Sequence, residues 1–97
     1  MQLGDIIAQL EDDAVADEAL IALGDLALTT RVAAAAARAA LSRGEFVAAS
    51  VGAFAANASD EDWVTVLGQM GRSDVPGRVL LRRAIEAALG AGAHEAA

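Results

Sequence analysis

The 97-residue sequence contains no cysteine, lysine or tyrosine, and only one histidine. Without cysteine the chain can form no disulfide and offers no thiolate as a nucleophile or metal ligand. Acid–base chemistry near neutral pH would then depend on His94. His94 lies near the end of the chain in the segment GAGAHEAA, where nothing holds a side chain to the tolerance that catalysis requires. We therefore expect a non-enzymatic protein with no cofactor, no catalytic residue and no metal site.

Aromatic residues are also scarce, with one tryptophan and two phenylalanines, whereas 26 residues are alanine. Alanine has the highest helix propensity, and its small side chain lets helices approach closely. The sequence therefore predicts an all-α fold, a compact bundle of five or six short helices packed through alanine, in which consecutive helices can pair as hairpins. We expect a single helical domain over residues 1–89 and a flexible C-terminal tail over residues 90–97.

Long hydrophobic runs are absent. The longest segment without charge, residues 46–59, is shorter than the roughly 20 residues that a membrane-spanning helix needs. The N-terminal sequence MQLGDIIAQLEDD lacks the basic region of a signal peptide. We expect a cytoplasmic protein that does not bind a membrane.

Hydrophobic periodicity and capping residues predict six helices. Asp12 or Asp13 is expected to cap the second helix and Ser59 the fifth. Ser73 or Asp74 is expected to cap the sixth, with Pro76 in its first turn. Gly44 is expected to follow the end of the third helix, Gly71 to end the fifth, and the sixth to end near Leu89. The predicted helices cover residues 3–10, 14–23, 25–43, 45–57 and 60–71, and a sixth helix runs from residue 74 or 75 to residue 89.

The third predicted helix contains the stretch RVAAAAARAALSRG. Val32 and Leu41 are nine positions apart, which places them on opposite sides of a helix with about 100° per residue. This spacing predicts a central helix that is packed on two sides. We expect Ala36→Leu and Ala37→Leu to destabilise the fold by overpacking.

The fifth helix carries Trp63, Leu67 and Met70 at positions i, i+4 and i+7. Such a stripe can be an exposed binding surface, because tryptophan is enriched at interaction hot spots. A chain with three aromatic residues can hardly leave its only tryptophan in solvent. We therefore expect this stripe to belong to the core.

Charge is distributed unevenly. Residues 1–30 carry seven acidic residues and no basic one, so the net charge of −7 belongs to the first third of the chain. Asp13 and Asp17 lie one helical turn apart, but their segment lacks the spacing of a calcium loop, so we interpret these acids as helix N-terminal charge. The arginines lie further along the chain and can complement the acids within one molecule or between molecules. We expect contacts between subunits or with a different protein. The candidate partner-binding residues are Asp12, Asp13, Asp17, Glu18, Arg72, Arg78, Arg82 and Arg83.

Two functions fit these features. We favour a small accessory or interaction protein, an adaptor or subunit that binds a protein partner or itself, because catalytic residues are missing and charge is segregated. The alternative is a transcription regulator that uses residues 64–84 as a helix-turn-helix, with arginines on the early turns of the second helix. The acidic net charge disfavours nucleic acid as a partner.

Overall fold

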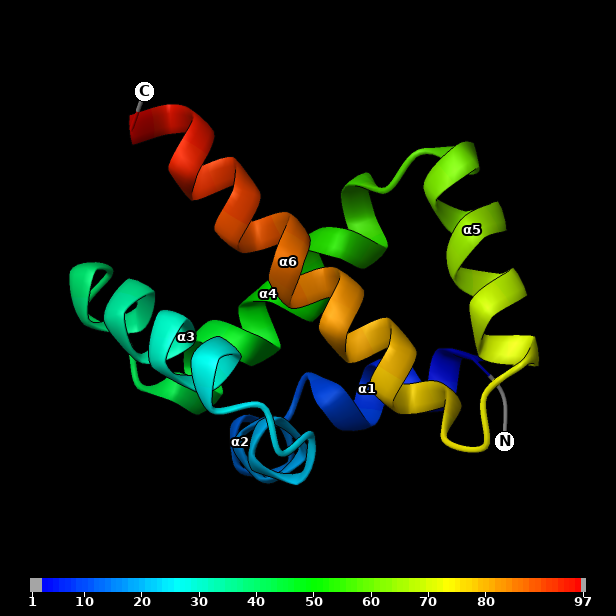
Figure 1. Ribbon diagram of the computed structural model, residues 1–97, viewed down its shortest axis with the longest axis horizontal. Coiled ribbons are helices and arrows are strands. Elements are labelled where there is room, and N and C mark those ends of the chain that lie inside the picture. The colour runs from blue at the N-terminus through cyan, green and yellow to red at the C-terminus, as the bar shows by residue number, and fades with distance from the viewer. Residues whose placement is uncertain (1–2, 97) are drawn as a thin grey trace.

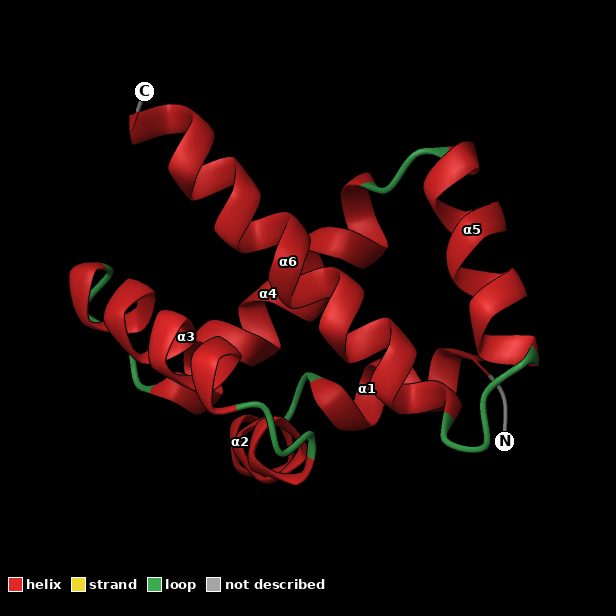
Figure 2. Ribbon diagram, in the orientation of Figure 1, coloured by secondary structure: helices red, strands yellow, loops and turns green. Residues whose placement is uncertain are grey.

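The computed structural model describes residues 3–96, and it describes the side chains of residues 3–90. This part of the chain forms six α-helices joined by short loops and contains no strand (Figures 1 and 2). The predicted all-α fold is therefore confirmed. The helices are α1 (Leu3–Leu10), α2 (Asp13–Ala22), α3 (Leu26–Arg38), α4 (Arg43–Asn57), α5 (Asp60–Gly71) and α6 (Pro76–Ala96).

Local hydrogen bonds explain where several helices begin. The carboxylate of Asp12 accepts hydrogen bonds from two backbone N–H groups in the first turn of α2. Capping boxes, in which the N-cap side chain and the third helical residue bond each other's backbone, begin two further helices. Ser42 and Glu45 form one at α4, and Ser59 and Asp62 form the other at α5. The predicted Ser59 cap is therefore confirmed.

The third helix ends earlier than predicted. Helix α3 ends at Arg38, and Ala40 adopts a left-handed conformation with φ of 58°. The Ala40 N–H donates to the Ala37 carbonyl at 3.1 Å, and the Leu41 N–H donates to the Ala36 carbonyl at 2.9 Å. These two bonds are those of a Schellman motif, which normally places glycine at the left-handed position. The predicted continuation of the helix to residue 43 is wrong.

Gly44 lies inside α4 rather than after α3. Helices α2 and α4 pass very close together there, and a Cβ on Gly44 would overlap the Asp13 carbonyl oxygen. The same Cβ would lie 3.3 Å from the Cβ of Asp17. The glycine is therefore needed for a close helix approach, not for a helix end.

Helices α4 and α6 form the centre of the molecule. They cross each other, and helix α2 also packs extensively on α4 (Figure 1). Leu80, Leu81 and Ile85 of α6 and Val47 and Val51 of α4 are at most 1% exposed. The ring of Phe54 at the end of α4 packs edge-on against Trp63 of α5, with ring centroids 5.3 Å apart. This contact ties α5 to the centre.

Helix α3 lies at one edge of the molecule (Figure 1). Its buried residues Leu28, Val32 and Ala36 form a single stripe four residues apart, whereas Ala37 is exposed. Because the helix ends before Leu41, that side chain supplies no second packed face. The predicted central position of this helix is therefore wrong.

Helix α6 extends past Leu89 to Ala96. The predicted helix end near Leu89 is therefore too early, since the alanines among residues 87–96 favour helix strongly enough to outweigh Gly90 and Gly92. The flexibility of residues 90–97 stays a prediction. The side chain of His94 lies outside the part of the chain for which side chains are described.

Candidate functional site

Some of the predicted charge complementarity is found within one molecule. Asp17 of α2 accepts two hydrogen bonds from Arg43 of α4, at 3.0 Å from Nε and 3.2 Å from Nη2. This bidentate pair lies beside the close contact at Gly44, where both residues are about one-third exposed. Asp17 is therefore occupied in holding α2 on α4.

A second pair joins α6 to the start of α3. Arg82 donates a hydrogen bond of 2.9 Å to Asp25, which is the N-cap of α3. The pKa of Asp25 is lowered from its ordinary value of 3.8. The main cause is the hydrogen bond from the Leu28 backbone N–H, and the second is the hydrogen bond from Arg82. Arg82 is therefore committed to an intramolecular contact.

The other acidic and basic candidates lie on different elements of the fold. Asp12 caps α2, and Asp13 and Glu18 are exposed on the same helix. Arg72 follows α5, and Arg78 lies in the first turn of α6, where both are exposed. The structure thus does not bring the eight predicted residues into one site.

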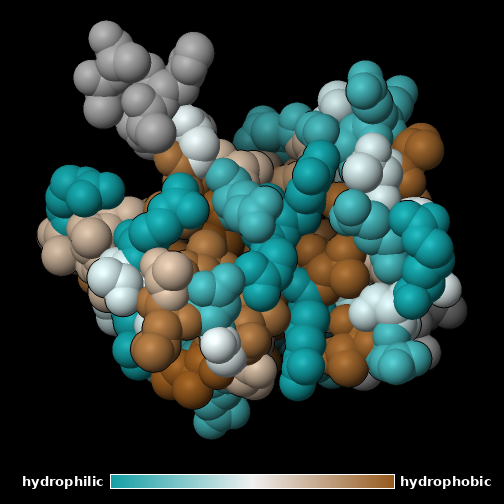
Figure 3. Space-filling model, in the orientation of Figure 1, coloured by the Kyte–Doolittle hydropathy of each residue, from teal (hydrophilic) through white to brown (hydrophobic). Residues whose placement is uncertain are grey.

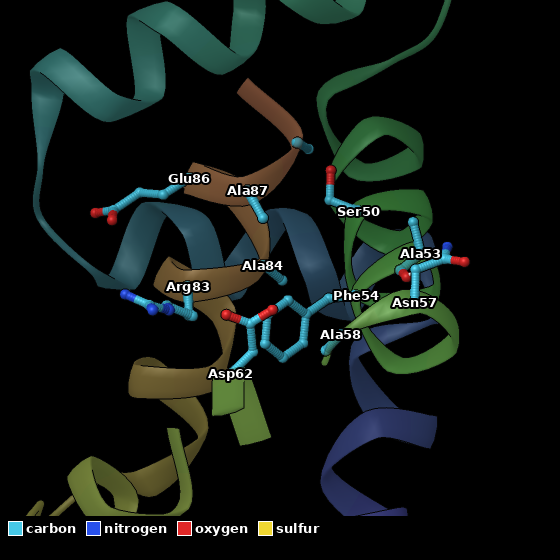
Figure 4. Close-up of a pocket in the computed structure, with 11 residues that line it drawn as sticks. Ser50, Ala53, Phe54, Asn57, Ala58, Asp62, Arg83, Ala84, Glu86 and Ala87 are labelled. Atoms are coloured by element: carbon cyan, nitrogen blue, oxygen red, sulfur yellow. Dashed lines mark hydrogen bonds between the residues drawn. The ribbon is translucent and has the colours of Figure 1, made fainter. Parts of the chain in front are cut away.

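Arg83 lines a mostly apolar cleft between α4 and α6, with a volume of about 500 Å³ (Figure 4). Ser50 and Asn57 lie on the α4 side of this cleft, and Arg83 and Glu86 lie on the α6 side. Both polar groups on α4 already donate hydrogen bonds to carbonyl oxygens of their own helix, Ser50 to Phe46 and Asn57 to Ala53. The charged side chains that line the cleft are those of Asp62, Arg83 and Glu86, of which Asp62 takes part in the capping box of α5.

A larger hollow lies between α1, α2, the end of α5 and the start of α6. Its volume is about 740 Å³, and most of its wall is apolar. We call this hollow the apolar groove. It is lined by Leu3, Ile6, Gln9, Leu10, Val15, Ala19, Ala22, Leu67, Met70, Gly71, Asp74, Val75, Pro76, Gly77, Arg78 and Leu81.

The apolar groove contains large side chains that the fold leaves in solvent. Val15 is 40% exposed, Leu67 is 48% exposed and Val75 is 44% exposed. Each comes from a different element, α2, α5 or the loop before α6, and the structure brings them to one hollow. Figure 3 shows further hydrophobic surface over α2 and between α5 and α6, separated by a hydrophilic band over α6.

The orientation of α5 leaves Leu67 exposed. Its inward stripe is Trp63, Val66 and Met70, of which Val66 is fully buried and Met70 is 8% exposed. The predicted core stripe of Trp63, Leu67 and Met70 is therefore wrong for Leu67. Leu67 instead shares an outward face with Val64, three residues earlier. The sequence contains one indication that an apolar residue of this helix would be exposed, because apolar residues occupy two of its faces.

Charged side chains of both signs lie at the apolar groove. Asp74, in the loop before α6, and Arg78 of α6 line it directly. Glu18 is exposed on α2 one turn from Val15 and Ala22, but it is not part of the lining. Asp13 lies on the other side of α2, where it lines a separate hollow with Asp17 and Arg43. The charged lining of the apolar groove therefore has no excess of one sign.

Residues 64–84 do contain two helices joined by a turn, as the DNA-binding alternative requires. In this segment Leu80, Leu81 and Ala84 are buried against the rest of the fold. Arg82 is paired with Asp25, which leaves Arg78 and Arg83 as the arginines of α6 without an ion pair to the described residues. The face that this segment offers to DNA is therefore narrow and weakly basic.

Within the described residues, no three histidine, cysteine, aspartate or glutamate side chains are grouped closely enough to hold a metal ion. No helix in residues 3–96 is both long enough and apolar enough to span a bilayer. Comparisons of the chain with models of protein families, with curated proteins and with solved structures find no match.

Proposed function

We propose that this protein is a non-enzymatic interaction module, an adaptor or small subunit whose apolar groove receives part of a protein partner. The observation that carries this proposal is the convergence of Val15, Leu67 and Val75 on one hollow while all three remain exposed. Single exposed apolar residues are common on proteins, but a contiguous group of them in a concave surface favours binding. A volume of about 740 Å³ is large enough to receive several side chains of a partner.

Charged residues at the groove support the same function. Asp74 and Arg78 line it, and Glu18 is exposed nearby on α2. Charged residues at the rim of an interface raise the association rate and select partners more than they raise affinity. Charged groups beside an apolar floor fit that role.

The proposal can be tested by purifying the tagged protein from its native host and identifying what co-purifies. Leu67→Asp places a charge in the apolar groove, and Leu26→Asp places the same charge at an 82% exposed residue outside the groove. We expect a partner that the wild type and the Leu26→Asp variant retain and the Leu67→Asp variant loses. Equal retention by the two folded variants would exclude the apolar groove as the binding site.

DNA binding by residues 64–84 is the second candidate function, and it is based on the arrangement of α5 and α6. Its support is the helix–turn–helix order with Arg78 exposed early in the second helix. A gel-shift measurement at low salt decides it, because electrostatic binding to DNA is strongest there. We expect no shift, and a shift that Arg78→Ala abolishes would restore this alternative.

A further inference from the structure

We infer that two copies of this protein associate through the outer face of α5, as an antiparallel pair of α5 helices related by a two-fold axis. This inference goes beyond the proposed function, because it concerns a surface next to the apolar groove and a second copy of the chain. It stands on three observations about α5: an exposed apolar stripe, two glycines within that stripe, and unpaired charges of opposite sign at its two ends.

The exposed stripe consists of Val64, Leu67, Gly68 and Gly71, and we call it the α5 stripe. These residues stand at positions i, i+3, i+4 and i+7, so they share one face of the helix. All four are exposed, Val64 at 73% and Leu67 at 48%. Leu67 also lines the apolar groove, whereas Val64 lies outside it. Helix α5 lies at one edge of the molecule (Figure 1), so this face is open to a second molecule.

The two glycines make the α5 stripe complementary to itself. Glycine at a helix contact lets two helices come close, because no side chain separates their backbones there. A Cβ on Gly71 would have no atom within 4 Å, so the surface beside it is open. In an antiparallel pair centred between Leu67 and Gly68, each Leu67 lies at the level of Gly68 of the other copy. Each Val64 then lies at the level of Gly71, so every large side chain of the stripe meets a glycine.

The ends of the α5 stripe carry opposite charges on the same flank. Glu61 and Arg72 are eleven positions apart, which is close to three full turns of a helix. Nη1 of Arg72 lies 3.6 Å from the position that a Cβ on Gly68 would take, so the guanidinium lies alongside the stripe. Both charged residues are exposed, and neither forms an ion pair with the described residues. Asp60 adds a second negative charge at the Glu61 end.

This order of charges selects an antiparallel pair of identical helices. A two-fold axis between antiparallel helices brings the same flank of both copies together with their ends exchanged. Glu61 of each copy then faces the end of α5 that carries Arg72 in the other, so one dimer contains two equivalent pairs. A parallel pair would instead place like charges beside each other, which is unfavourable.

The overall charge sets the conditions of the test. The net charge of −7 opposes association at long range. At about 0.15 M salt the Debye length is about 8 Å, so repulsion between distant charges is largely screened. A pair of short helices buries less surface than a standard interface, so we expect a weak dimer with a dissociation constant of roughly 10–300 μM.

Sedimentation equilibrium of the full chain measures the dimer, at about 0.15 M salt and from roughly 10 μM to 1 mM protein. We expect the wild type to be mostly dimeric at the upper end of this range. Val64→Asp places a charge in the α5 stripe and should weaken the dimer at least roughly tenfold. Leu26→Asp, the same charge at an 82% exposed residue of α3, should leave the dimer unchanged. Circular dichroism verifies that each variant is folded.

Charge reversal tests the antiparallel arrangement. Glu61→Arg and Arg72→Glu each place like charges opposite one another, so each should weaken the dimer roughly three- to tenfold. The double variant exchanges the two charges and restores opposite pairs between copies, so its dissociation constant should return to within about threefold of the wild type. The two residues are about 16 Å apart along one helix, so this recovery cannot arise within a single molecule.

Three results would overturn the inference. They are a wild type that stays monomeric at about 1 mM, equal dimerisation of the Val64→Asp and Leu26→Asp variants, and a double charge variant that is no better than the single ones. The proposed function is tested separately. Val64→Asp leaves the groove lining intact, so this variant should retain the partner that Leu67→Asp loses.

Discussion

The contact between α2 and α4 predicts opposite effects for the same substitution at two positions of one helix. At Gly44 a new Cβ would lie 3.0 Å from the Asp13 carbonyl carbon, and closer still to the carbonyl oxygen. Both atoms belong to the backbone of α2, so that helix would have to move away. At Gly52, also inside α4, a new Cβ would have no atom within 4 Å.

The expected magnitudes follow from these surroundings. Forcing extra atoms into a packed contact costs about 1–3 kcal/mol, while alanine favours a helix interior over glycine by about 1 kcal/mol. We expect Gly44→Ala to destabilise the protein by about 2 kcal/mol, which lowers the melting temperature by roughly 10 °C in a domain of this size. We expect Gly52→Ala to stabilise it by about 0.5–1 kcal/mol.

Urea denaturation followed by circular dichroism at 222 nm measures both changes. The two variants differ from the wild type by the same methyl group in the same helix, so propensity alone would move them in the same direction. A stabilising Gly44→Ala, or equal effects at the two positions, would refute the close approach of α2 and α4.

Three further predictions concern α3 and its caps. Ala40 has a positive φ, so Ala40→Gly should raise the unfolding free energy by about 0.5–1 kcal/mol in denaturant titrations; a decrease would contradict the Schellman end of α3. The lowered pKa of Asp25 means that its ionised form stabilises the fold above its ordinary pKa of 3.8, and that this contribution is lost as the pH falls through the lowered value. Asp25→Asn keeps a capping oxygen but cannot ionise, so the melting temperature of this variant should fall less steeply with acid than that of the wild type. Parallel plots of melting temperature against pH would contradict a stabilising role of the Asp25 carboxylate. Ala36 is 2% exposed, so Ala36→Leu should destabilise by about 1–3 kcal/mol. Ala37 is exposed, so the overpacking expected from the sequence does not apply there, and Ala37→Leu should change stability by less than about 0.5 kcal/mol. Similar melting temperatures of the two variants would contradict this difference in burial.

The sequence predicted the helical class and most helix starts, because these depend on local signals. Ser59 is followed by three acids, and α5 begins where these residues predict. Helix α6 begins at Pro76, one or two residues later than a cap at Ser73 or Asp74 predicts, and the Ser73 hydroxyl accepts a hydrogen bond from the Val75 N–H before the helix starts. The end of α3 was harder. A run of alanines carries no stop signal, and Gly44 was interpreted as the residue after a helix end, whereas in the structure Ser42 and Glu45 form the capping box that begins α4.

The apolar groove was not predictable in the same way. Its side chains come from four helices and a loop, and periodicity within one helix does not say which elements will become neighbours. Leu67 shows the difficulty, because its spacing to Trp63 and Met70 fits a core stripe. The neighbouring Val66 takes the buried position, which only the packing of α5 on α6 decides.

The partners of the charged residues were also not predictable from the sequence. The segregation of acids and arginines along the chain indicated that they would pair, and two such pairs form within the molecule. Their identities depend on the fold, since Asp17 meets Arg43 and Asp25 meets Arg82 across 26 and 57 positions of sequence. Of these four residues, Asp17 and Arg82 were among the candidates for partner binding.

The central claim is that a partner occupies the apolar groove, and site-specific photocrosslinking in the native host tests it most directly. A photoreactive amino acid is placed at Leu67, in the groove, or at Ala34, an exposed position on α3 at the other side of the molecule. We predict a discrete protein adduct from position 67 that is absent from position 34. No adduct from position 67, or the same adducts from both positions, would contradict the claim.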